Sequence, residues 1–340
     1  MNVTFMVGNG FDLGVGLKTR YEDFYDTYIN EKSNDACLNA FKTELKEWEE
    51  SKEKKIIDWA DFEKAFGEYS QRFTPNTKLS YIQCFENFVQ EFNTYLQKEE
   101  EKVQYTDEAL IIKTMQNSLM KFRDLRAADK AELVDVINKY SSEREYNFVS
   151  FNYTKVLDHC VEVLSSHMPY TSSKVGTMAH IHGYITENMI MGVNDPSQIL
   201  NKELADDPSI ISEIVKPKQN SDARSDYEKT VKRLISNSHI ICIYGMSIGA
   251  TDAKWWKLIA QWLEAHDWAR LIILKHDTKY DKRFPFKQNK LIDELVEHFI
   301  SFSELNDDKK QALRQRIYVG MNKDIFEMNL CKEEKELLTV

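Results

Sequence analysis

The sequence predicts an α/β protein whose doubly wound, mainly parallel sheet is interrupted by a large all-helical insertion. Short apolar or β-branched segments recur on both flanks, and most end at Gly, Asn or Asp, as is typical of parallel strands buried on both faces. Helical segments lie between these strands. Only 11 Gly and 6 Pro occur in 340 residues, and Gly67 is the only glycine between Gly16 and Gly176, which favours long helices there.

The strands and helices of the predicted sheet domain follow one another in a regular order. Strands are expected at residues 3–7, 146–151, 178–182, 189–193, 239–244, 270–274 and 316–319. Helices are expected between them, at residues 155–164, 227–235, 252–265 and 289–299. This alternation is typical of a parallel sheet with helices on both faces.

The long segment after the first strand has the pattern of amphipathic helices. Phe62, Ala65, Phe66 and Tyr69 recur at the spacing i, i+3, i+4, i+7. Similar apolar stripes run through 82–96, 110–122 and 133–137, and we expect them in a core rather than on a binding surface. The sequence therefore predicts a helical insertion domain at 20–143 and an α/β nucleotide-binding domain formed by 1–19 plus 144–340.

Composition excludes several classes of protein. The hydrophobic fraction of 42% and the aromatic fraction of 12% exclude a disordered chain. The sequence contains no apolar run of 18 residues, so no membrane span is predicted. The net charge of −10 disfavours a protein that coats nucleic acid. The five cysteines are far apart and include no C-x-x-C, so we expect reduced thiols. The N-terminal residues resemble no secretion leader, which favours a cytoplasmic location.

The candidate site lies in the loops that follow the strands, because ligands of an open parallel sheet bind beyond the carboxyl ends of its strands. Four such loops are unusual, at 8–12, 152–154, 180–183 and 245–252. Gly8 and Gly10 are expected to leave backbone N–H groups uncovered beside a helix N-terminus, where a pyrophosphate would bind. A tight strand exit would use the same glycines, and Leu13 stands where the dinucleotide fingerprint has another glycine.

Two of these loops allow more than one interpretation. Thr251 and Asp252 suit the N-cap of the next helix, either with its donors aimed at a ligand or as a plain cap. His180 and His182 would share one face of a strand and could hold a metal, but a catalytic metal needs about three protein ligands, so none is expected. A buried core histidine is the plainer alternative, although Gly183 ends the strand where a histidine would face a ligand.

Taken in this order, the motifs resemble the abortive-infection AbiH family of bacterial phage-defence proteins. The blocks that carry the resemblance are Gly8-Asn9-Gly10-Phe11-Asp12-Leu13, Gly16-Leu17-Lys18-Thr19-Arg20-Tyr21-Glu22-Asp23-Phe24, Trp59-Ala60-Asp61-Phe62-Glu63, Ser150-Phe151-Asn152-Tyr153-Thr154, His180-Ile181-His182-Gly183 and residues 244–252. Lys18 stands where the family commonly has proline. The first loop, Asn152 and His182 also resemble, more distantly, the NAD-binding residues of sirtuins.

The resemblance implies an antiphage effector that binds NAD and hydrolyses it at the bond between nicotinamide and ribose. It implies that Asn152 orients the ribose or the attacking water and that His182 is the general base. Sirtuin deacylases also carry a zinc module of paired cysteines, and its absence from this sequence disfavours removal of acyl groups from lysine. The residues expected to bind NAD are Gly8, Asn9, Gly10, Phe11, Asp12, Thr19, Tyr21, Asp23, Phe24, Tyr153, His180, Gly245, Ser247 and Asp252.

Two other functions stay open. A non-catalytic nucleotide-sensing or scaffold protein would keep the pocket without chemistry, and a metal-dependent phosphoesterase or nuclease would use His180 and His182. The expected partners are NAD or a related nucleotide, a phage-derived trigger and a second copy of the chain, but neither a membrane nor nucleic acid. The helical insertion is the expected surface for the trigger or for oligomerisation.

Overall fold

The computed structural model describes residues 1–50, 59–121, 125–140, 143–168, 173–222, 226–277, 283–321 and 325–331. Within this part of the chain, six parallel strands form one sheet in the order β3-β2-β1-β4-β5-β6. The strands are β1 (Asn2–Val7), β2 (Arg144–Ser150), β3 (Ser173–His180), β4 (Ile240–Tyr244), β5 (Arg270–Lys275) and β6 (Ile317–Met321). The predicted α/β class with a parallel sheet is confirmed.

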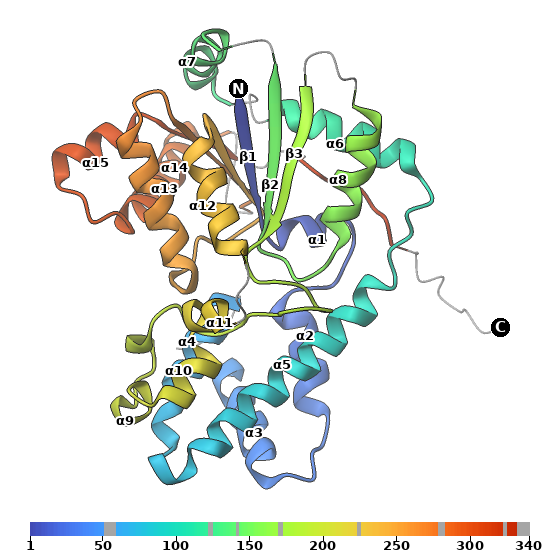
Figure 1. Ribbon diagram of the computed structural model, residues 1–340, viewed down its shortest axis with the longest axis vertical. Helices are drawn as coiled ribbons and strands as arrows, with labels where there is room; N and C mark the ends of the chain where they lie inside the picture. The colour runs from blue at the N-terminus through green and yellow to red at the C-terminus, as the bar shows by residue number, and fades with distance from the viewer. Residues whose placement is uncertain are drawn as a thin grey trace.

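Helices cover both faces of the sheet (Figure 1). One face carries α1 (Gly10–Gly14), α6 (Glu108–Lys121), α7 (Ala127–Asn138) and α8 (Val156–His167). The other carries α12 (Tyr227–Asn237), α13 (Ala253–Ala265), α14 (Pro285–Ser301) and α15 (Asp307–Arg314). Along β1, Phe5 and Val7 belong to the first face and Met6 to the second, because successive side chains of a strand point to opposite faces.

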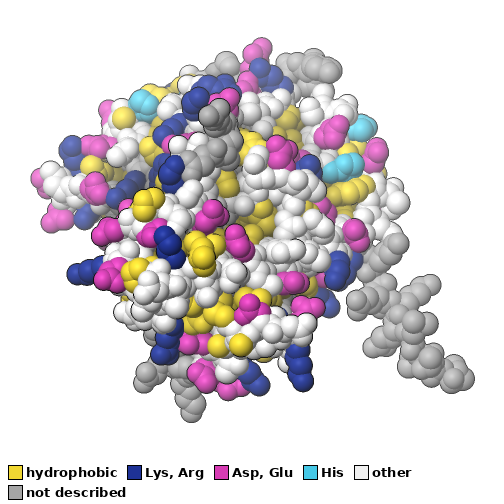
Figure 2. Space-filling model, turned by 60° about the horizontal axis from the view of Figure 1, so that its bottom comes forward, with side chains coloured by type: hydrophobic (Ala, Val, Ile, Leu, Met, Phe, Trp, Pro, Cys, Tyr) yellow, Lys and Arg dark blue, Asp and Glu magenta, His cyan; other side chains and the backbone are white. Residues whose placement is uncertain are grey.

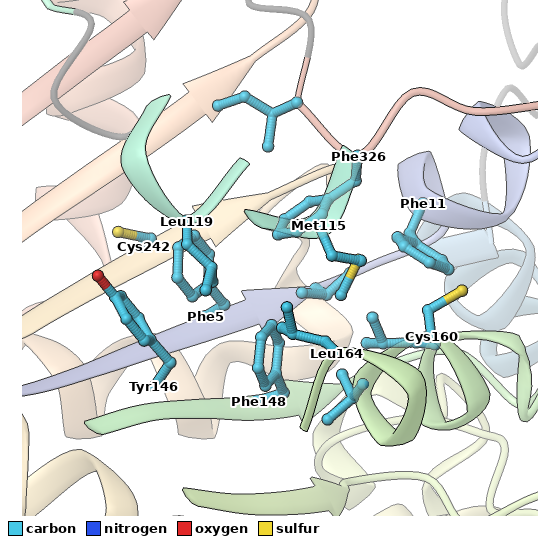
Figure 3. Close-up of a cluster of buried hydrophobic side chains, with 14 of the residues drawn as sticks. Phe5, Phe11, Met115, Leu119, Tyr146, Phe148, Cys160, Leu164, Cys242 and Phe326 are labelled. Atoms are coloured by element: carbon cyan, nitrogen blue, oxygen red, sulfur yellow. The ribbon is translucent and has the colours of Figure 1, made fainter. Parts of the chain in front are cut away.

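Aromatic rings fill the core of the first face (Figure 3). The rings of Phe5 and Phe148 are stacked with centres 5.6 Å apart, and Phe326 meets Phe5 edge-on at the same separation. Met115 and Leu119 of α6 pack in the same cluster. Burying a side chain of this size contributes about 1.5–3 kcal/mol, so this core fixes the position of β1, the central strand of the site.

A second group of helices forms what we call the helical lobe. It comprises α2 (Tyr21–Asn30), α3 (Ala36–Glu50), α4 (Trp59–Tyr69), α5 (Lys78–Glu100) and residues 185–222, with η1 (Ser70–Arg72), η2 (Pro75–Thr77), η3 (Pro196–Gln198), α9 (Lys202–Ala205), α10 (Pro208–Ile214) and α11 (Lys216–Asp222). The rings of Phe62 and Phe88 are stacked with centres 3.8 Å apart, and Phe24 meets Phe88 edge-on. The apolar stripes of α4 and α5 face this core, as their spacing predicts.

Packing distributes the predicted insertion over two cores. Ile111 and Met115 of α6 and Leu133 of α7 are buried against the sheet rather than in the helical lobe. In turn, Ile210 and Ile214 of α10 are buried in the helical lobe, although they follow β3 in the chain. The predicted boundaries, 20–143 against 1–19 plus 144–340, stay a prediction about domains.

Two strand predictions are corrected. Residues 189–193 form no strand: Val193 makes a single parallel bridge to Val215, and Gly192 has a φ of +136°, which interrupts extended pairing. Met191 and Val193 are buried in the helical lobe, so their apolar run reflects a buried loop. The strand expected at 178–182 ends at His180, and the chain bends after it.

The surface of the helical lobe is mixed in charge. Figure 2 turns this end of the molecule toward the viewer and shows Lys and Arg side chains interspersed with Asp and Glu and with hydrophobic groups. No helix among the described residues combines the length and the apolar character needed to cross a lipid bilayer.

Candidate functional site

The site lies where the strand order reverses, between β1 and β4, the position at which doubly wound sheets bind ligands. The loops that follow these two strands are joined backbone to backbone. The Gly8 N–H donates to the Tyr244 carbonyl oxygen at 2.9 Å, and the Gly10 N–H donates to the Gly245 carbonyl oxygen at 2.7 Å. The two loops therefore form one floor for the site.

Glycine is required at this floor because the backbones touch. A Cβ atom on Gly10 would lie 2.5 Å from the Gly245 Cα, and Gly245 has a φ of +69°. The expectation that the N–H groups of Gly8 and Gly10 are uncovered is wrong, since carbonyls of the β4 loop already accept from both. The structure has the tight strand exit that the sequence also allowed.

A cavity of about 370 Å³ opens above this floor. Its volume falls within the range of roughly 300–1,000 Å³ that is typical of small-molecule pockets. The lining includes twelve of the predicted site residues, namely Gly8, Asn9, Gly10, Asp12, Thr19, Tyr21, Asn152, Tyr153, His182, Gly245, Ser247 and Asp252. Loops that are distant in sequence thus meet at one cavity, and both Asn152 and His182 line it.

Asp12 of α1 joins the loops after β1 and β2. Its carboxylate is buried and accepts from the Asn152 side-chain amide at 2.8 Å and from the Thr154 hydroxyl at 2.9 Å. Burial raises the pKa of Asp12 to about 7, because it disfavours the charged form more than these two hydrogen bonds favour it, and the Glu100 charge acts in the same direction as burial. Asp12 can therefore exchange a proton near neutral pH.

His182 and Asp252 face each other across the cavity wall. The His182 Nε2 lies 3.0 Å from the Asp252 Oδ1, and the imidazole meets the Phe151 ring edge-on. His182 is 96% buried, with 4% of its surface exposed, and its Nδ1 has no hydrogen-bond partner among the described residues. That buried nitrogen has an unused hydrogen-bonding position.

Asp252 is the last residue of η4 (Ala250–Asp252) and the N-cap residue of α13, but its side chain makes no capping hydrogen bond. Its Oδ1 instead lies 3.4 Å from the Lys216 Nζ as well as against His182. The plain-cap interpretation is therefore wrong for this carboxylate, which is part of the cavity wall.

Lys216 and Glu63 extend this arrangement into the helical lobe. The Lys216 Nζ lies 2.8 Å from the Glu63 Oε2, and the Gly192 N–H donates to the other Glu63 oxygen at 3.1 Å. Both side chains are almost completely buried, and buried ionisable groups in proteins are usually paired in this way.

The charges of this cluster shift one another's pKa values. Burial disfavours the charged Asp252, but the Lys216 and His182 side chains outweigh it and hold the pKa of Asp252 below its usual range. Burial likewise disfavours the charged Lys216, yet Asp252 and Glu63 raise the pKa of Lys216 above its usual value. Burial raises the pKa of Glu63, against the pull of Lys216. Asp252 and Lys216 are therefore charged at neutral pH.

His180 belongs to a different cluster. Its Nε2 lies 2.8 Å from the Asp158 Oδ2, its Nδ1 lies 3.1 Å from the Asn152 carbonyl oxygen, and the Tyr184 hydroxyl donates to Asp158. The expectation that the two histidines share a face is wrong, because β3 ends at His180. The described residues contain no group of three or more His, Cys, Asp or Glu side chains that could hold a metal.

The remaining predicted residues have structural contacts. The Asn9 and Thr19 side chains bond to each other at 2.5 Å. Four predicted residues lie outside the cavity lining: Phe11 and Phe24 are in the two cores, the Asp23 carboxylate accepts from the Arg20 N–H at the start of α2, and His180 is as described above.

Several residues that line the cavity were not predicted from the sequence. Among them, Glu63, Thr154 and Lys216 make the contacts described above. Glu63 lies in a block that the family resemblance singled out, and Thr154 lies in one of the four unusual loops. No pattern in the sequence marks Lys216, because its partners come from distant segments.

The chain matches a known protein family over most of its length. A protein-family model described as bacteriophage abortive infection AbiH matches residues 4–273, which is more than half of the chain and includes every cavity residue named above. No curated protein matches the sequence.

Proposed function

Because the chain belongs to the bacteriophage abortive infection AbiH family, we propose that it is an effector that hydrolyses NAD at the bond between nicotinamide and ribose. The observation that carries the proposal is the meeting of Asn152 and His182 at one cavity, at the reversal point of a parallel sheet. The sheet order is the one in which dinucleotides bind across this crevice.

The residues of the cavity suit this chemistry. Cleavage of the bond to ribose passes through an oxocarbenium-like transition state, which requires a held ribose and one admitted water. His182, oriented by Asp252, accepts the proton of a ribose hydroxyl or of the water. The bond to Asp12 uses one N–H of the Asn152 amide, and the rest of that amide orients the ribose or the water.

The phosphates of NAD need a binding partner other than the backbone N–H groups of the glycines. The N–H groups of Gly8 and Gly10 already have acceptors. Arg20 and Lys275 line the cavity, and we propose that their cationic groups neutralise the pyrophosphate.

The decisive experiment measures nicotinamide released from NAD by the purified protein, alone and with extract of phage-infected cells as the source of a trigger. Asn152→Ala and His182→Ala should reduce release by about 100-fold or more, since a general base contributes about 10² to 10⁴-fold. The matched controls are Asn237→Ala and His167→Ala, which change exposed residues of α12 and α8. Release that is unchanged in both cavity variants would overturn the proposal.

A nucleotide-sensing protein without chemistry is the second candidate. The observation that favours it is that the N–H groups of Gly8 and Gly10 and the side-chain amide of Asn152 already donate hydrogen bonds within the protein. Calorimetry separates the two: tight NAD binding without nicotinamide release, even in extract of infected cells, would support the sensor. We further propose that the helical lobe receives the phage-derived trigger or a second copy of the chain.

A further inference from the structure

Three buried side chains and the partly exposed side chain of Asp252 form a continuous row from the helical lobe to the cavity. Glu63 Oε2 lies 2.8 Å from Lys216 Nζ, which lies 3.4 Å from Asp252 Oδ1, which in turn lies 3.0 Å from His182 Nε2. Glu63 comes from α4, Lys216 opens α11, Asp252 ends η4, and His182 follows β3. Glu63 and Lys216 thus come from the helical lobe, whereas Asp252 and His182 come from segments that follow strands of the sheet.

We propose that Lys216 and Glu63 are positioning residues for His182, with Lys216 fixing the Asp252 carboxylate against the imidazole and Glu63 fixing Lys216. This inference rests on the proposed role of His182 as general base. It adds that the base is set by two residues of the helical lobe, neither of which touches it directly.

The geometry favours positioning over simple stabilisation. A buried ion pair is weak evidence for stability, because removing charges from water offsets most of their attraction. Here the single oxygen Oδ1 of Asp252 faces both Lys216 and His182, so the lysine fixes where that oxygen lies. A carboxylate held in this way orients a histidine and stabilises the proton that the histidine takes up.

The charge of the row also suits a base. Both oxygens of Glu63 face donors, the Lys216 ammonium and the Gly192 N–H, as those of an ionised carboxylate do, so a proton arriving on His182 balances the second carboxylate of a row that holds one lysine. Tyr153 also lies against this cluster, but burial, together with Glu63 and Asp252, raises the pKa of Tyr153 well above its usual value. Its hydroxyl therefore stays neutral and leaves this balance unchanged.

Two single variants should move the pH dependence of nicotinamide release in opposite directions. In Lys216→Met, the Asp252 carboxylate no longer faces the lysine ammonium, so it stabilises a proton on His182 more strongly. The acidic limb of the pH–rate profile therefore moves to higher pH by on the order of one unit. In Glu63→Gln, one negative charge is lost and the acidic limb moves to lower pH. We expect kcat to fall about tenfold or more in Lys216→Met, with KM for NAD changed by less than about threefold.

The control is Lys42→Met, which removes the other buried lysine of the helical lobe, whose Nζ donates to the Glu31 carbonyl oxygen. It should leave the pH profile in place even if it lowers stability. Should Lys216→Met fail to fold, the double variant Glu63→Gln/Lys216→Met removes the paired charges together and should still move the acidic limb upward, by less. Profiles that superimpose on that of the unchanged protein in both single variants would overturn the proposal.

A second readout needs no turnover. The ring signals of His182 in nuclear magnetic resonance spectra, recorded against pH without NAD, should titrate at higher pH in Lys216→Met and at lower pH in Glu63→Gln. If these shifts occur and no condition yields nicotinamide, the hydrolase proposal fails while the positioning proposal stands. If nicotinamide is released and neither shift occurs, the positioning proposal fails alone.

Discussion

The carboxyl group of Asp12 is closed off from solvent, and its chemistry follows from that burial. Asn152 and Thr154 donate to it, and the nearby Glu100 carboxyl group adds to the effect of burial. Because the pKa is raised to about 7, the folded protein keeps a proton on Asp12 at pH values where the unfolded chain has lost it.

Stability should therefore fall as pH rises, and Asp12→Asn should remove part of that fall. The folded pKa exceeds the usual 3.8, so the favourable contribution is complete below about pH 4 and is lost as pH rises through about 7. The upper limit of the loss is about 4 kcal/mol. Urea unfolding of both proteins between pH 5 and 8 measures it, and parallel curves would contradict the raised pKa.

Direct backbone contact between the loops after β1 and β4 holds the elements of the site together. The β1 and β4 loops approach so closely that a methyl group at position 10 has no room. Gly14 ends the same helix, α1, but a Cβ there would meet only ordinary contacts, the nearest being the Phe326 carbonyl oxygen at 3.4 Å. The two glycines therefore form a matched pair for substitution.

Gly10→Ala should lower the free energy of unfolding by about 1–3 kcal/mol or more, because the backbone of the β4 loop must move. It should also weaken any binding of NAD to the cavity. Gly14→Ala should be neutral or slightly stabilising, since alanine is the better helix former. Thermal unfolding and calorimetry check both, and equal effects of the two substitutions would show that the loops are not in tight contact.

The sequence predicts elements whose pattern is local and misses contacts that only the tertiary structure makes. The apolar runs of β1 and β4 and the stripes of α4 and α5 each carry their own signal, so these elements were predictable. The run at 189–193 is apolar because it is buried against the helical lobe, and a buried loop has the same composition as a strand. The four loops of the site were predictable because strand ends converge in a parallel sheet.

The pairing of Glu63 with Lys216 was beyond prediction. Each residue lies on a helix, where a charged side chain is expected in solvent unless a partner from elsewhere in the chain pairs with it. Only the docking of α4 against α11 and η4 brings the two charges together and excludes water from them.

The described part of the molecule has three cores, one on each face of the sheet and one in the helical lobe, and the chain crosses between the sheet and the lobe several times. Lys18 lies beside the end of α5: its N–H donates to Glu99 at 3.0 Å, and its carbonyl oxygen accepts from the Tyr95 hydroxyl at 2.8 Å. The two ends of the segment 21–100 are thus close enough for a short linker to replace that segment.

Replacing residues 21–100 by a flexible Gly/Ser linker should yield a chain that aggregates or lacks a cooperative unfolding transition. The reason is that the apolar side chains of α10 and its neighbours, such as Ile210 and Ile214, would lose their cover. Light scattering and urea unfolding measure this. A soluble chain with a sharp transition would show that the sheet domain folds without these helices.

The contact between Gly10 and Gly245 has a consequence for the timing of synthesis. The first strand leaves the ribosome early, but both of its neighbours in the sheet, β2 and β4, are translated much later. A nascent chain therefore has no ligand crevice until the residues through Asp252 have emerged. Polysomes that make this protein therefore carry unfinished copies in which the crevice has not yet assembled.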